Sequence, residues 1–106
     1  NQLAGTMSGG ERKMLAIGRG LMSNPELLLV DEPSFGLAPQ LTESVFESLN
    51  ALKKRGVTIM LVEQNVTKTL AVTDRGYVLE NGRIELEGRS KDLACNAHVR
   101  KVFLGV

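Results

Sequence analysis

Two short apolar runs, joined by a segment with helical periodicity, constrain the fold of this chain most. Leu27–Asp31 is continuously apolar until its final carboxylate, which is typical of a parallel strand buried on both faces. Val57–Val62 is a second run rich in β-branched and apolar residues. Between the two runs, from Pro39 onward, apolar residues recur at helical spacing: Leu41, Val45, Leu49 and Leu52. We therefore predict a parallel β-α-β unit and an α/β fold.

A further helix is predicted before the first strand, from Ser8 to about Ser23, because apolar residues recur there with a period near 3.6. Ser8 and Glu11 have the spacing of a capping box, in which the hydroxyl accepts from a free N–H and the carboxylate reaches back to the cap. Asn24-Pro25 is expected to end the helix. Gly20, inside it, should cost roughly 1 kcal/mol relative to alanine.

After the second strand, the sequence predicts a short helix and a β-hairpin. Asn65 can cap a helix that runs to about residue 73. Asn81-Gly82, the pair most favoured in a type I′ turn, lies between two strand-like segments at 76–80 and 83–87. These segments are expected to pair as a hairpin.

The end of the chain is predicted to be a helical tail. Ser90 and Asp92 open it. We assign residues 88–106 to this tail, within one domain that spans residues 1–106. Apolar residues of the tail are expected to dock on the body: Leu93, Val99, Val102 and Phe103. His98 is expected to be a surface or partly packed residue, not a catalytic one.

Composition and charge exclude several classes of protein. The chain has 13 Lys and Arg against 12 Asp and Glu, and aromatic residues make up 4%, so it has neither a basic footprint nor stacking platforms for nucleic acid. Its longest purely apolar runs have four residues, far below the ~18 that span a bilayer. Cys95 is the sole cysteine, which excludes an internal disulfide and fits a reducing compartment. Because the sequence begins at Asn1 and has no leader, we expect it to be a fragment of a longer protein.

Asp31 and Glu32 are the first candidates for chemistry. In open α/β sheets, ligands bind outside the carboxyl ends of the strands, where these side chains are expected to lie. Asp31 could hold Mg²⁺, directly or through water, and Glu32 could orient or deprotonate an attacking water. A strand that ends in solvated acids is the simpler alternative, and the dipeptide alone does not decide between them.

Ser8-Gly9-Gly10 is the second candidate. Glycines allow a phosphate to approach the backbone, and the free N–H groups at a helix start attract an anion. The same residues could be only a good helix cap. However, an anion-binding helix start that precedes an apolar strand ending in Asp31-Glu32-Pro33 is a combination unlikely to arise by chance.

These motifs resemble the second half of an ABC-transporter ATP-binding subunit. The resemblance rests on Met7–Glu11, Leu27–Pro33 and Leu61–Asn65. Met14–Arg19, Gly36–Pro39 and Asp74–Glu80 are similar, in particular, to the ATPases of branched-chain amino acid importers. The resemblance covers essentially the whole chain and implies the C-terminal part of a P-loop NTPase fold: parallel strands with flanking helices, then a β-hairpin and a helical tail.

The resemblance also implies roles for individual residues. Ser8, Gly9, Gly10 and Glu11 would belong to the signature loop, which closes over the γ-phosphate of ATP held by a partner subunit. Asp31 would be the Walker B aspartate that serves Mg²⁺, and Glu32 the catalytic carboxylate that positions the hydrolytic water. Gln64 would occupy the switch position, and Phe35–Ala38 the loop that touches the opposite subunit.

The sequence departs from the family pattern at several positions. Met7 and Glu11 replace the usual leucine and glutamine, and Ala38 replaces an aspartate. Gln64 replaces a switch histidine; its amide can donate a hydrogen bond to a phosphate oxygen but cannot become cationic. The 106 residues contain no Gly-x-x-x-x-Gly-Lys-Ser/Thr loop, which in the family lies upstream. We therefore expect the chain alone to bind ATP poorly.

Three functions remain open from the sequence. The first is an ATP- and Mg²⁺-dependent subunit that pairs with a second ATPase subunit and with membrane permease subunits, on the cytoplasmic face of the cell membrane, without inserting into the bilayer or binding nucleic acid. The second is a truncated, non-catalytic interaction module. The third is a non-transport ABC ATPase, which the lack of coiled-coil heptads and of a basic patch disfavours.

Overall fold

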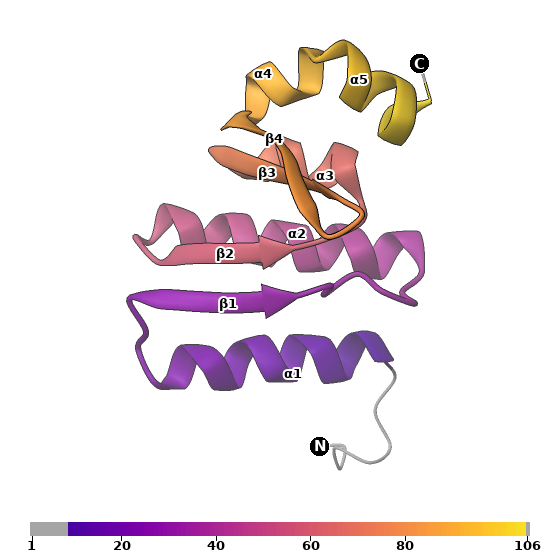
Figure 1. Cartoon of the computed structure of the whole chain (residues 1–106). Coiled ribbons are helices and arrows are strands. Elements are labelled where there is room, and N and C mark those ends of the chain that lie inside the picture. The colour runs from indigo at the N-terminus through magenta and orange to yellow at the C-terminus, as the bar shows by residue number, and fades with distance from the viewer. Residues whose placement is uncertain (1–8, 106) are drawn as a thin grey trace. The chain divides into compact units, whose positions relative to one another are not determined.

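The computed structural model describes residues 9–105 and divides the chain into two compact units, with the boundary between Gln64 and Asn65. Helices and strands alternate in the first unit, as Figure 1 shows. It contains α1 (Gly9–Met22), β1 (Leu27–Asp31), α2 (Pro39–Lys54) and β2 (Thr58–Val62). The second contains α3 (Val66–Val72), β3 (Arg75–Glu80), β4 (Arg83–Arg89), α4 (Ser90–Cys95), α5 (Ala97–Val99) and the π-helical η2 (Arg100–Leu104).

The predicted β-α-β unit is confirmed in the first unit. β1 and β2 pair in parallel, with Leu27 opposite Thr58 and Asp31 opposite Val62. α2 connects them; it has Pro39 in its first turn and is followed by Gly56 at φ 94°, a conformation that glycine adopts without strain. Since both strands run in the same direction, their carboxyl ends lie at one edge of the sheet (Figure 1).

One face of this sheet packs on the hydrophobic core of the first unit. The core contains four buried side chains from α1 and α2: Ile17, Val45, Leu49 and Leu52. Alternate strand residues pack against it: Leu28, Val30, Ile59 and Leu61. Gly20 of α1 also has a packing role, because a Cβ there would lie 3.0 Å from Leu28 Cδ1. Glycine therefore lets the helix approach β1 closely.

The other face of the sheet is exposed in the part of the chain that the structure describes. Its residues keep half or more of their side chains accessible: Leu27 (53%), Leu29 (67%), Met60 (60%) and Val62 (51%). The prediction that Leu27–Asp31 is buried on both faces is therefore wrong for residues 9–105. The strand is apolar throughout, but α1 and α2 supply packing partners to one face of it.

In the second unit, the predicted hairpin is confirmed. β3 and β4 pair antiparallel, and Asn81 (φ 51°) and Gly82 (φ 74°) both have the positive φ that a type I′ turn requires. The strands are longer than predicted, because Arg75 and Arg89 also pair. The cap of α3 is confirmed as well, since Asn65 Oδ1 accepts from the Lys68 N–H at 3.2 Å.

The tail matches the prediction in part. Leu93 and Val99 are buried as expected, but Val102 (53%) and Phe103 (39%) are exposed. The helix widens to a π-helix at Arg100, so the residues that follow do not keep the spacing of a regular α-helix. Ser90 opens α4 as predicted, and its hydroxyl pairs with Thr73 Oγ1 at 2.6 Å.

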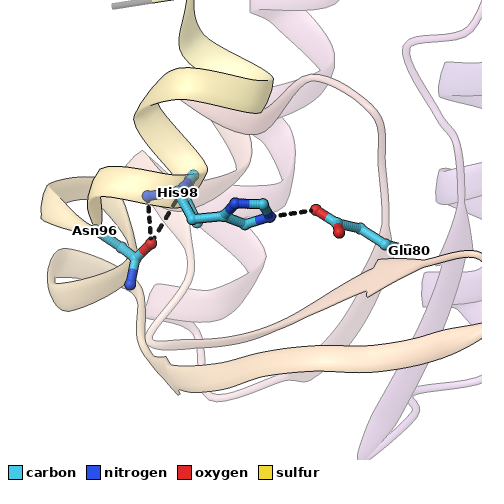
Figure 2. A network of polar contacts seen from close by, with 4 residues as sticks. Glu80, Asn96 and His98 are labelled. Carbon is cyan, nitrogen blue, oxygen red and sulfur yellow. Dashed lines mark hydrogen bonds and ion pairs between the residues drawn. The ribbon is translucent and has the colours of Figure 1, made fainter.

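Polar contacts fix the start of α5 (Figure 2). Asn96 Oδ1 accepts from the N–H groups of His98 (2.9 Å) and Val99 (3.1 Å), and His98 Nε2 lies 2.8 Å from Glu80 Oε1 at the end of β3. The contact joins α5 to the hairpin.

Within residues 9–105, none of the helices combines the length and the apolar character that spanning a membrane requires.

Candidate functional site

The candidate site lies where β1 and β2 end. Asp31 is the last residue of β1 and pairs in register with Val62, the last residue of β2. Glu32 comes directly after β1, and Gln64 comes two residues after the end of β2. The Glu32 N–H donates to the Val62 carbonyl at 2.7 Å. Asp31 and Gln64 are exposed, and Glu32 is half-buried. The parallel register therefore brings the predicted Walker B and switch segments together.

Glu32 has an uncommon backbone conformation, with φ 45° in the left-handed region. Three hydrogen bonds hold it. Its N–H bonds to Val62, while its carbonyl oxygen accepts from the Phe35 N–H at 3.1 Å and from the Lys13 Nζ of α1 at 2.8 Å. Both hydrogen-bonding groups of the peptide backbone at Glu32 are therefore satisfied by neighbouring elements, which stabilises a conformation that glutamate rarely adopts.

Glu63 is a further residue of this edge and is not among the predicted site residues. Its Oε2 accepts from the Ser34 N–H at 3.0 Å, and its Oε1 accepts from the Gln64 N–H at 3.0 Å. One carboxylate thus joins the loop after Glu32-Pro33 to the segment after β2. The sequence held a signal for Glu63, because this residue follows a predicted strand directly, as Glu32 does. The backbone groups with which Glu63 forms hydrogen bonds depend on the fold and could not be identified from the sequence.

The signature segment is described in part. Gly9 and Gly10 open α1 and Glu11 is exposed in its first turn, whereas Ser8 and Met7 lie outside the described residues. A Cβ built at Gly9 would lie 3.8 Å from Leu37 Cδ2, so the start of α1 lies beside the loop that follows β1. Phe35 of that loop is 70% exposed. The capping box and the phosphate contacts predicted for Ser8 remain predictions.

The carboxylates of this edge fit a magnesium ion that is bound mainly by phosphate and water. Among residues 9–105, no group of three or more His, Cys, Asp or Glu side chains is arranged to hold a metal ion. Mg²⁺ that accompanies a nucleotide keeps several waters and takes only one or two carboxylates from the protein. A single exposed carboxylate at Asp31 is compatible with that donor set. The roles of Asp31, Glu32 and Gln64 remain predictions.

Comparisons with known proteins give a consistent family. Residues 1–35 match the family model described as "ABC transporter". The high-affinity branched-chain amino acid transport ATP-binding protein BraG of Pseudomonas aeruginosa is 56% identical over 104 residues, which are 98% of this chain and 45% of BraG. The resemblance to ATPases of this branch is thereby confirmed.

Solved structures agree with the sequence comparisons. An ATP-binding cassette of an ABC transporter in its ADP conformation superposes with a TM-score of 0.81 at 35% identity, over 100% of this chain and 43% of that chain. A dimeric bacterial ABC transporter cassette gives 0.72 at 27% identity, over 85% of this chain and 39% of that chain. The chain thus spans less than half the length of these relatives. By sequence and by fold, it is similar to a part of the ATP-binding proteins of ABC transporters.

Proposed function

We propose that this chain supplies the signature, Walker B and switch segments of the ATP-binding and ATP-hydrolysing subunit of an ABC importer, with branched-chain amino acids as the transported class. The observation that carries the proposal is the parallel pairing of β1 and β2, which places Asp31-Glu32 beside Glu63-Gln64 at one edge of the sheet. The similarity to BraG supports the substrate class.

Each residue of the edge has a distinct part in this proposal. Asp31 would hold Mg²⁺, which offsets the charge of the phosphates when bound. The Glu32 carboxylate would orient the attacking water and accept its proton. The Gln64 amide would donate a hydrogen bond to a phosphate oxygen. Because that amide stays neutral, it offsets less developing charge than a protonated histidine could.

The signature segment would act on a second nucleotide, held by a partner subunit. The free N–H groups at the start of α1, opened by Gly9 and Gly10, favour an anion, as do the aligned peptide dipoles of a 14-residue helix. Ser8 and Glu11 would complete this loop. A relative solved as a dimeric cassette supports pairing with a second ATPase subunit. The complete subunit would also dock on membrane permease subunits, at the cytoplasmic face of the membrane.

The phosphate-binding loop must come from outside these 106 residues, since the sequence holds no Gly-x-x-x-x-Gly-Lys-Ser/Thr. We therefore expect the chain alone to be inactive. A direct test uses BraG with its matching 104-residue region replaced by this chain, hereafter the grafted cassette. The grafted cassette should hydrolyse Mg-ATP.

Glu32→Gln in the grafted cassette should bind Mg-ATP and lose turnover by about 100-fold or more, the usual contribution of a general base. Glu26→Gln is the matched control, because this exposed glutamate precedes the other end of β1. It should leave turnover within about twofold of the unmodified protein. Equal turnover in the two variants would contradict the role of Glu32, and a grafted cassette that folds without hydrolysing ATP would contradict the proposed function.

A further inference from the structure

Glu32 has a backbone conformation that needs support from its surroundings. Among residues 9–105, the non-glycine residues with positive φ are Asn24, Glu32 and Asn81. Asparagine tolerates the left-handed region because its short side chain bonds locally, whereas glutamate has no such compensation. Such strained conformations persist only where the surrounding structure over-determines them. The contacts that hold Glu32 therefore also fix the direction in which its side chain leaves the backbone.

One of these contacts comes from a side chain of α1. The bonds to Val62 and Phe35 continue the sheet and close the turn after Glu32, respectively. The third bond comes from a side chain 19 positions earlier in the sequence. Lys13 Nζ donates to the Glu32 carbonyl oxygen at 2.8 Å, in a partly buried position. A hydrogen bond from an ammonium group is charge-assisted and is stronger than a neutral one. Lys13 is therefore the residue through which α1 stabilises the backbone conformation of Glu32.

We infer that Lys13 is a positioning residue for Glu32: its ammonium group holds the Glu32 carbonyl, and thereby the left-handed backbone that aims the Glu32 carboxylate. Lys13 lies one helical turn after Gly9, on the same side of α1. The helix start assigned to phosphate binding and the carboxylate assigned to water activation are thus joined through one side chain. This inference rests on the role proposed for Glu32.

The first test separates turnover from nucleotide binding in the grafted cassette. Lys13→Met keeps the aliphatic stem and removes the donor, and it should lower kcat about tenfold while KM for ATP stays within about twofold. Lys13→Arg retains a cationic donor and should keep kcat within about threefold. Lys54→Met, in the exposed last turn of α2, is the matched control and should change neither. A kcat for Lys13→Met equal to that of the control overturns the inference, as does a loss confined to KM.

The second test asks whether Lys13 acts through Glu32. In the Glu32→Gln background, adding Lys13→Met should cause no further loss of turnover, because the group that it positions is already disabled. A further tenfold loss would overturn the inference. If Glu32→Gln alone retained full turnover, the role proposed for Glu32 would fail instead, so the two failures are distinguishable.

A third readout needs neither nucleotide nor turnover. The Phe35 amide shares the Glu32 carbonyl with Lys13 as its acceptor, so Lys13→Met should speed hydrogen exchange of that amide about tenfold. The Asn24 amide, which donates to Leu21 O at 2.9 Å in a turn of the same unit, is the internal reference and should be unchanged. Equal exchange of the Phe35 amide before and after the substitution overturns the inference, and faster exchange of both amides indicates general loosening and overturns it as well.

Discussion

The exposed face of the β1–β2 sheet predicts how the chain behaves by itself. Leu29 and Met60 are register partners on this face, with 67% and 60% of their surfaces accessible. Complete burial of such a side chain contributes about 1.5–3 kcal/mol. Covering the exposed part of the pair should therefore favour association by about 2–4 kcal/mol for each copy that buries it, or about 30- to 1000-fold per copy in the association constant. We expect the chain alone to self-associate.

Replacing both residues tests this magnitude. The double variant Leu29→Lys, Met60→Lys places charges on the exposed face without touching the core, and sedimentation velocity over a range of concentrations should show it largely monomeric. Met22→Lys is the control, since Met22 is 87% exposed at the end of α1, away from this face. It should associate like the unmodified chain. An unmodified chain that stays monomeric at all concentrations would refute the reasoning. A Met22→Lys variant as monomeric as the double variant would refute it as well.

Two further predictions concern stability and are best measured by urea denaturation in the background of that double variant. Leu49→Ala should lower the free energy of unfolding by about 3 kcal/mol, because Leu49 is 2% exposed in the core and its truncation leaves a cavity; a loss under 1 kcal/mol would contradict the packing described. Asn65→Ala should lower the free energy of unfolding by about 1 kcal/mol, because the cap on α3 is lost, whereas Asn65→Ser should retain most of the stabilisation that the cap provides. Equal effects of the two substitutions would mean that the cap does not stabilise the helix.

Much of the fold was predictable because its local signals agree with one another. Leu27–Asp31 and Val57–Val62 have strand composition, the segment between them has helical spacing, and Asn81-Gly82 suits only a narrow class of turns. Tertiary context limited the rest. The apolar pattern of β1 could not reveal that one of its faces is exposed within residues 9–105, and the apolar residues of the tail could not reveal the π-helix that begins at Arg100.

The candidate site was predictable in its side chains but not in its backbone contacts. Asp31 and Glu32 could be selected because their types and their position after an apolar run suggest chemistry, and Gln64 because of the family resemblance. The bonds from Lys13 to the Glu32 carbonyl and from Ser34 to Glu63 depend on where α1 and the loop after β1 lie in space. No spacing rule identifies a backbone carbonyl as the partner of a lysine 19 positions away.

Titration calorimetry with Mg-ATP tests the central claim most directly, on this chain alone and on the grafted cassette. The account predicts binding by the grafted cassette, equal binding by its Glu32→Gln variant, and little or no binding by the chain alone, which contains no phosphate-binding loop within its 106 residues. Tight binding by the chain alone would place the nucleotide elsewhere than at the edge formed by Asp31, Glu32 and Gln64, and would contradict the account.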